Sequence, residues 1–180
     1  MTGGLFPIPL SPELWTVGQL CTTFKLSYKH TLYTFALFDV TFPSEEELKL
    51  EAETLDLTSP IIICSMNGQP FDRYADSLFG KREIAYKNAP DFKKEISLET
   101  GLLPLRQNDL QRLLKPFFGL LPWDCYYRDD YVDQFLLPGT VKRSDVRYLK
   151  DYTTDELRAI LPPDLFKLKE RLRVEKEEHG

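Results

Sequence analysis

An apolar run over residues 31–42 limits the folds open to this chain more than any other segment. Its large apolar side chains are Leu32, Tyr33, Phe35, Leu37, Phe38, Val40 and Phe42, with few polar residues between them. A strand that is exposed on one face alternates apolar and polar residues, whereas a strand covered on both faces does not. The run therefore predicts a central strand of a sheet that is covered on both sides.

A capped helix and a second buried strand are predicted after this run. Ser44 and Glu47 have the spacing of a capping box, for a helix that continues to about Leu55. Residues 60–66 are again almost entirely apolar, which predicts a second buried strand. Two further strands are predicted over residues 83–87 and 92–98.

The first 28 residues admit two interpretations. Residues 1–10 contain two prolines and predict an irregular arm. Ser11-Pro12 has the order of a capped helix start. Apolar residues follow it at helical spacing: Leu14, Val17, Cys21 and Phe24. Because Gly18 and two adjacent threonines disfavour a helix, a strand over residues 19–28 is the alternative.

The pattern changes from strands to helices after Gly101. Asn108 can cap a helix that Pro116 would end or bend. Further helix starts are predicted at Ser144, at Thr153 or Thr154, and at Pro163. Strands first and helices afterwards are typical of an α+β protein. We therefore predict an N-terminal mixed or antiparallel sheet with one or two helices, followed by a mostly helical C-terminal part.

Length and composition fit one structural domain. The chain has 180 residues, of which 42% are hydrophobic and 28% charged, close to the values of ordinary globular proteins. We predict an α+β core over residues 1–138 and a helical extension over residues 139–180 that packs on it. No apolar stretch approaches the roughly 20 residues that cross a bilayer. We expect a soluble, cytoplasmic protein with no membrane partner.

The usual catalytic and cofactor motifs do not occur in this sequence. Cys21, Cys64 and Cys125 are widely spaced and form no CxxC pair, so we expect buried free thiols in a reducing compartment rather than a zinc site. Glycine-rich phosphate loops, nucleophile elbows and HExxH motifs do not occur either. We therefore assign no cofactor and no catalytic residue, which favours a protein that is not an enzyme.

Residues 117–135 combine aromatic rings with acids. Seven of these nineteen residues are aromatic. Tyrosine and tryptophan are enriched at binding hot spots, and neighbouring aspartates would select a basic partner. The predicted partner-binding residues are Trp123, Tyr126, Tyr127, Asp129, Asp130 and Tyr131. The alternative is that the rings pack the sheet against the C-terminal helices.

The same segment offers a metal-site alternative. On a helix, Asp129 and Asp133 would share a face and could ligate Mg²⁺ or Ca²⁺ together. Together with Asp124 and Asp130 they would then serve a divalent-metal-dependent hydrolase or nuclease. The simpler interpretation of these aspartates is a solvated acidic face.

The last helix carries the cations through which nucleic acid would bind, namely Lys167, Lys169, Arg171 and Arg173. The net charge of −5 argues against such a partner. A small-molecule-binding domain, with its pocket between sheet and helices, is a further alternative. The leading prediction is a non-enzymatic protein-interaction module, such as an accessory subunit, adaptor or inhibitor, whose partner is a protein with a basic patch.

Overall fold

The chain folds into two compact units. The computed structural model describes residues 2–27, 30–67, 74, 76–86, 104–105, 109–126 and 128–179. Unit 1 comprises Met1–Leu110 and Leu136–Pro138, and unit 2 comprises Gln111–Phe135 and Gly139–Gly180. The chain therefore leaves unit 1 after Leu110 and contributes to it once more before its C-terminal part. The predicted division between residues 1–138 and 139–180 stays a prediction.

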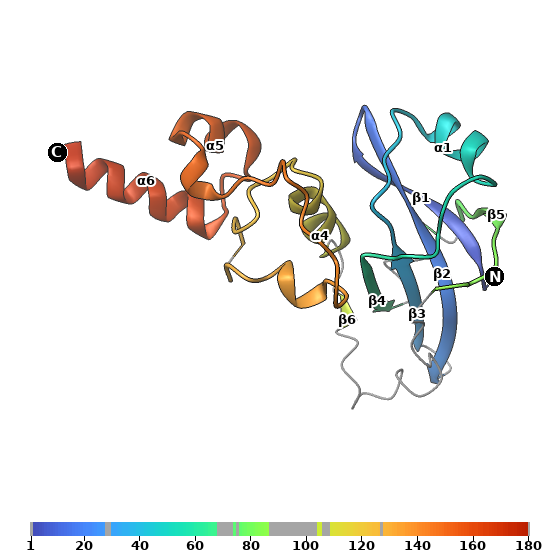
Figure 1. The fold of residues 1–180 in the computed structure, drawn as a ribbon. Coiled ribbons are helices and arrows are strands. Elements are labelled where there is room, and N and C mark those ends of the chain that lie inside the picture. Colours follow the sequence, from blue (N-terminus) through green and yellow to red (C-terminus); the bar gives the residue numbers. More distant parts are fainter. Residues whose placement is uncertain are drawn as a thin grey trace. The chain divides into compact units, whose positions relative to one another are not determined.

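Unit 1 is built on a sheet whose described strands lie in the order β5-β1-β2-β3-β4-β6 (Figure 1). The strands are β1 (Gly4–Ser11), β2 (Leu14–Ser27), β3 (His30–Leu37), β4 (Ile62–Asn67), β5 (Phe79–Lys81) and β6 (Pro104–Leu105). Neighbouring strands are antiparallel, except that β4 and β6 are parallel. The predicted α+β class is confirmed.

β3 lies inside the sheet, between β2 and β4. Phe35, Ala36 and Leu37 are each 0% exposed, although successive side chains of a strand point to opposite faces. The predicted two-sided burial is therefore confirmed. The strand ends earlier than predicted, at Leu37. Phe42 instead exchanges two backbone hydrogen bonds, of 2.8 and 2.9 Å, with Trp15.

The predicted N-terminal helix is wrong, and its strand alternative is correct. Residues from Leu14 onward form β2, and Pro12 and Glu13 occupy the turn that joins it to β1. Val17 and Leu20 point to opposite faces of the sheet and are both 0% exposed. Because residues 16–21 of β2 are buried on both faces, this part of the strand lacks the apolar–polar alternation that would have distinguished it from a helix.

The predicted irregular arm is wrong as well, because it forms β1. Pro7 and Pro9 lie opposite Val17 and Trp15 of β2. Since the two prolines are two residues apart, their nitrogens point to the same edge of the strand. Proline is tolerated in a strand where its nitrogen points away from the neighbouring strand.

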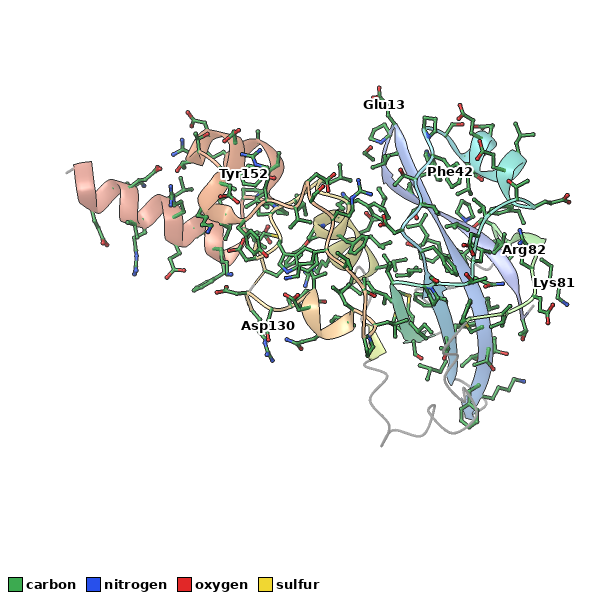
Figure 2. All side chains as sticks on the ribbon, in the orientation of Figure 1. Glu13, Phe42, Lys81, Arg82, Asp130 and Tyr152 are labelled. Atoms are coloured by element: carbon green, nitrogen blue, oxygen red, sulfur yellow. The ribbon has the colours of Figure 1, made fainter. Side chains whose placement is uncertain are left out.

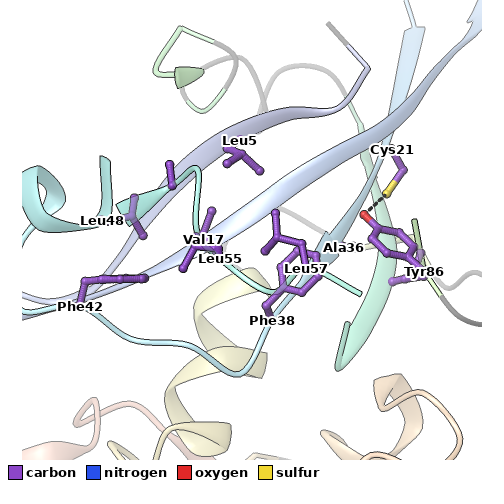
Figure 3. Close-up of a cluster of buried hydrophobic side chains, with 12 residues drawn as sticks. Leu5, Val17, Cys21, Ala36, Phe38, Phe42, Leu48, Leu55, Leu57 and Tyr86 are labelled. Atoms are coloured by element: carbon purple, nitrogen blue, oxygen red, sulfur yellow. Dashed lines mark hydrogen bonds between the residues drawn. The ribbon is translucent and has the colours of Figure 1, made fainter. Parts of the chain in front are cut away.

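One face of the sheet packs on α1 (Glu45–Glu51) and the chain that follows it (Figure 3). The buried residues of this cluster are Leu5, Val17, Cys21, Ala36, Phe38, Phe42, Leu48, Ala52, Leu55, Leu57, Ile63 and Tyr86. The side chains come from four strands, from the segment between β3 and β4 that includes α1, and from the residues after β5. This cluster is therefore the main core on that face of the sheet.

Both ends of α1 are capped. Ser44 Oγ accepts a hydrogen bond from the backbone N–H of Glu47 at 3.1 Å, which confirms Ser44 as the N-cap. The reciprocal bond of the predicted capping box, from the N–H of Ser44 to the Glu47 side chain, stays a prediction. The helix ends at Glu51, before the predicted Leu55. There the guanidinium of Arg82 donates to the carbonyls of Ala52, Glu53 and Leu55 at 2.8, 2.6 and 3.2 Å. The arginine thus binds the carbonyl of the C-cap residue Ala52 and two carbonyls of the chain that follows it.

A buried polar network links the segment after β5 to the sheet. The hydroxyl of Tyr86 donates to Gln19 Oε1 at 2.7 Å and hydrogen-bonds Cys21 Sγ at 3.3 Å (Figure 3). Gln19 Nε2 donates to the carbonyl of Arg82 at 3.0 Å. Residues 83–86, predicted as a strand, are irregular and place Tyr86 in the core. The predicted strand over residues 92–98 and the Asn108 cap lie outside the described residues.

Unit 2 is mostly helical, as predicted. Its helical segments are α4 (Asp109–Phe117, which begins in unit 1), the 3₁₀ turns η1 (Asp133–Phe135) and η2 (Leu149–Asp151), α5 (Thr154–Ile160) and α6 (Phe166–His179). The helix predicted at Ser144 is wrong, because turns occupy that stretch. A helix starts at the predicted place, and of the two candidates it is Thr153 that caps α5, through reciprocal hydrogen bonds with Glu156.

The second core lies within unit 2. Its buried residues are Leu121, Cys125, Tyr152, Leu157, Leu161 and Leu168. They join α5 and α6 to the chain that follows α4. Across the described ranges, no helix combines the length and the apolar character that a membrane crossing requires.

Gly18 provides a test of the close packing across β1 and β2. A Cβ built on Gly18 would lie 2.2 Å from Cζ of Phe6, its direct cross-strand neighbour. We expect Gly18→Ala to lower the free energy of unfolding by about 2 kcal/mol, because an added methyl group forces a packed core apart. Urea unfolding followed by circular dichroism would measure the loss.

The matched control is the double variant Gly18→Ala with Phe6→Leu. A smaller side chain at position 6 makes room for the methyl group. The double variant should therefore lose less unfolding free energy than the sum of the losses in the single variants Gly18→Ala and Phe6→Leu. Strictly additive losses would contradict the steric explanation.

Candidate functional site

The aromatic residues of the segment 117–135 that the structure describes separate into a buried set and a half-buried set, both within unit 2. Phe117, Phe118 and Trp123 are 0%, 6% and 1% exposed. The ring centroid of Phe117 lies 5.3 Å from that of Phe118 and 6.5 Å from that of Trp123. The burial of Trp123 contradicts a place for its ring on an open binding surface, and the short distances between the rings show that these three pack on one another.

Trp123 is held by a carboxylate and an ammonium group. Its indole N–H donates to Asp133 Oδ2 at 2.8 Å, and Asp133 Oδ1 pairs with Lys142 Nζ at 2.6 Å. The ammonium group also lies 4.4 Å from the indole centroid. Burial is the largest single influence and lowers the pKa of Lys142, but the hydrogen bonds and charges of Asp133 and Tyr148 together outweigh it, so the pKa of the lysine is raised. The three side chains therefore fix the chain on both sides of residues 124–132.

Three half-buried rings form what we call the aromatic row: Tyr126, Tyr131 and Phe135. The centroids of Tyr126 and Tyr131 lie 5.5 Å apart, as do those of Tyr131 and Phe135. The planes of the rings are inclined at 62° and 60°. The guanidinium of Arg112 lies 5.6 Å from the centroid of Tyr126, at one end of the row. Tyr127, also predicted for this site, lies outside the described residues.

Two of the predicted aspartates occupy the turn between Tyr126 and Tyr131. Asp130, labelled in Figure 2, accepts two hydrogen bonds from Arg128 at 3.0 and 2.9 Å. These bonds hold the pKa of Asp130 below its ordinary value. The Asp129 side chain is 83% exposed and pairs with Lys167. The structure thus places both carboxylates at the surface beside the row, each with a cation of the same chain.

The geometry expected of a metal site is not formed by these aspartates. Asp129 lies in a turn and Asp133 begins η1, so the two do not share one helix face as predicted. Asp133 is committed to Trp123 and Lys142, and Asp124 accepts a hydrogen bond from a backbone N–H at 2.8 Å. Within the part of the chain that the structure describes, no three His, Cys, Asp or Glu side chains are placed to hold a metal ion.

The cations predicted as a basic face are distributed around α6. They are Lys167, Lys169, Arg171 and Arg173. Residues two apart on a helix are rotated by about 200°, so successive members of this set point in nearly opposite directions. The side chain of Lys167 is only 13% exposed, and its ammonium donates to the carbonyl of Asp124 and to the carboxylate of Asp129. The predicted face therefore does not form.

Each unit contains a surface hollow. In unit 1 a hollow of about 580 Å³ is lined by Thr2, Gly3, Lys81, Arg82, Glu83 and Ile84. In unit 2 a hollow of about 250 Å³ between α5 and α6 is lined by Leu149, Leu157, Lys167, Glu170, Arg171 and Val174. The second is smaller than the roughly 300–1,000 Å³ of ordinary ligand pockets. The small-molecule alternative stays a prediction.

The three cysteines are buried free thiols, as predicted. Burial raises the pKa of Cys21 to about 12, against a smaller opposing effect of its hydrogen bond with Tyr86. Burial and the nearby charge of Asp124 raise the pKa of Cys125 to about 12. Because the thiolate is the reactive form, neither thiol is suited to nucleophilic chemistry at neutral pH.

Comparison with known proteins identifies no relative of this chain. No family model, curated protein or solved structure matches it. The choice of site therefore rests on geometry alone.

Two residues of this site were missing from the sequence-based prediction: Phe135, which belongs to the row, and Arg112, which lies beside it. Phe135 is one of the seven aromatic residues of the segment, and its spacing from Tyr131, one helical turn, was the available signal. Arg112 precedes the segment and carries no sequence signal for this role. Its place at Tyr126 follows from how α4 packs within unit 2.

Asp133 provides a test of the structural role assigned to it. We expect Asp133→Ala to lower the free energy of unfolding by about 2 kcal/mol, because the buried indole N–H of Trp123 loses its acceptor. Asp133→Asn keeps an acceptor oxygen and should lose less than half as much. Urea unfolding of both variants checks this, and equal losses would show that the indole bond is not the cause.

The thiols provide a second test. We expect Ellman's reagent at pH 8 to label none of the three cysteines rapidly in the folded protein, because a pKa of about 12 leaves almost no thiolate at Cys21 and Cys125. In guanidinium chloride all three should react at once. Rapid release of one equivalent of nitrothiobenzoate, the coloured product of the reagent, from the folded protein would contradict the burial of these thiols.

Proposed function

We propose that this protein is a non-enzymatic interaction module, acting as an accessory subunit, adaptor or inhibitor, that binds a protein partner through the aromatic row. The observation that carries the proposal is the row itself: Tyr126, Tyr131 and Phe135 are half-buried, and the ring of Tyr131 packs against both of the others. Rings that are already packed lose little conformational freedom on binding, and they offer a large contact area.

The rings rather than the charges would supply most of the affinity. Asp129 and Asp130 are exposed at the turn and would favour a partner with a basic patch. Each already pairs with Lys167 or Arg128, and exposed ion pairs contribute little to affinity. The carboxylates would therefore select and orient the partner, while buried tyrosine and phenylalanine area would hold it.

A cytoplasmic location is part of the proposal. Three free thiols in one chain are typical of a reducing compartment, where disulfides do not persist. Their burial would keep them from cross-linking a partner.

Affinity capture from the native host tests the proposal. We expect the wild-type protein to retain a defined partner and the double variant Tyr131→Ser with Phe135→Ser to lose at least about tenfold of it, because aromatic hot spots dominate such interfaces. The matched control is Phe24→Ser, since Phe24 is 46% exposed on β2 of unit 1 and lies outside the row. It should retain the partner.

Thermal melting of each variant separates binding from folding. Tyr131→Phe keeps the ring and should keep both stability and capture. The proposal fails if the double variant melts like the wild type and still retains the same partner.

A further inference from the structure

The outer side of β1 is paired over only part of its length. In the sheet, β1 lies between β5 and β2 (Figure 1). Within the described residues, β2 pairs with β1 from Leu5 to Ser11, whereas β5 pairs with it only at Gly4 and Leu5. The stretch from Phe6 to Ser11 therefore has a described strand on one side only. The backbone N–H and C=O groups on the other side of such a stretch are a template for pairing with a further chain.

The backbone direction of Pro9 follows from the contacts of its partner in β2. Trp15 lies opposite Pro9 and exchanges two backbone hydrogen bonds, of 2.8 and 2.9 Å, with Phe42. Opposite residues of an antiparallel pair exchange either two hydrogen bonds or none. Since the bonds of Trp15 point away from β1, Pro9 directs its nitrogen and its carbonyl away from β2, to the outer side. Pro7, two residues earlier, points the same way.

A second contact supports this alternation. The N–H of Arg82, directly after β5, donates to the carbonyl of Gly3 at 2.9 Å, so position 3 also points outward. The outward positions of β1 and the residue before it are therefore 3, 5, 7 and 9. The first two, Gly3 and Leu5, contact β5 or the residue that follows it. The next two are Pro7 and Pro9, neither of which has an N–H to donate.

Pro7 and Pro9 are the residues of β1 that oppose pairing with another strand. Positions 1–12 contain no charged side chain. The residues beside the prolines are the large apolar Phe6, Ile8 and Leu10. Uncharged apolar segments of this kind pair with copies of themselves, and charged side chains or prolines at an edge prevent it. Pro9 is also exposed, so this part of β1 lies at the surface.

The opposite edge of the sheet is closed in a different way. β6 pairs with the end of β4. Near the start of β4, Leu136 forms a bridge with Ile62, and the N–H of Leu137 donates to the carbonyl of Ile61 at 2.9 Å. Two segments that are distant in the sequence thus occupy that edge by pairing, whereas the outer side of β1 beyond Leu5 depends on proline.

We infer that Pro7 and Pro9 close the outer edge of β1 to strand addition and so prevent two copies of this chain from pairing β1 against β1. The inference concerns unit 1 and does not depend on the proposed function. When two antiparallel β1 strands are related by a two-fold axis at Ile8, Pro7 of one copy lies opposite Pro9 of the other. The same two residues therefore remove the donors of both strands, and the carbonyls that face the partner gain no hydrogen bond.

Substitution of both prolines by valine tests the inference. Pro7→Val with Pro9→Val restores both donors and places a residue that is favoured in strands at each position. Size-exclusion chromatography with light scattering measures the mass of the full chain. We expect the mass of the double variant to rise with protein concentration toward twice that of the wild type, whose mass should not change. Pro43→Val is the matched control, because Pro43 is exposed and lies outside the strands, and it should behave as the wild type does.

A control with N-methylvaline separates the missing donor from the change of side chain. Cys21 allows the full chain to be assembled by native chemical ligation of a synthetic peptide of residues 1–20 to the rest of the protein. N-methylvaline at positions 7 and 9 has the side chain of valine but no N–H. This protein should keep the mass of the wild type, whereas the ligated valine version should associate. Association of both would show that the donors are not the cause and would overturn the inference.

Hydrogen exchange locates the new contact. In the double variant the backbone amides of residues 6–11 should become protected as the protein concentration rises, because they enter a second ladder. Protection confined to other segments would overturn the inference. If circular dichroism shows that the double variant does not fold, Pro9→Val alone decides, since position 9 is exposed. A folded variant of either kind that keeps the wild-type mass at every concentration also overturns it.

Discussion

Burial of the central strands on both faces is the constraint on which unit 1 depends. β2 and β3 have apolar or hydrogen-bonded side chains on each side, and Thr16, Gln19 and Thr34 are each 0% exposed. Each buried polar atom of such strands needs a hydrogen-bond partner. Without one, the free energy of desolvating that atom would be lost from the stability of the fold. The network of Gln19, Cys21 and Tyr86 meets this requirement and fixes the chain after β5 against the sheet.

In unit 2 the corresponding constraint is the buried indole of Trp123. Its N–H requires an acceptor, and the carboxylate of Asp133 provides it while Lys142 neutralises the charge. Asp133 follows the turn that carries Asp129 and Asp130, and it begins the 3₁₀ turn that ends at Phe135. The packing of one buried ring thus determines where the exposed carboxylates and the aromatic row lie.

The elements that were predicted correctly are those whose signal is local. The N-caps are examples: Ser44 caps α1 and Thr153 caps α5. Each cap contacts a residue within one helical turn, so a few neighbouring residues of the sequence are enough to predict it. β2 was ambiguous because a strand buried on both faces loses its alternation. Among the predicted site residues, Tyr126 and Tyr131 belong to the aromatic row, whereas Trp123 lies in the core, although it too is an aromatic residue with a polar group. Composition does not distinguish these two outcomes.

The sequence by itself determined the α+β class, the central strand, the helix caps and the segment in which aromatic rings and acids gather. These depend on the order of neighbouring residues and on how much apolar surface a segment must bury. Only the tertiary structure decided which rings are half-buried and which are core, and which carboxylates are committed to cations. Those properties depend on partners distant in the chain, such as Lys167 for Asp129, because burial and ion pairing are set by packing between segments.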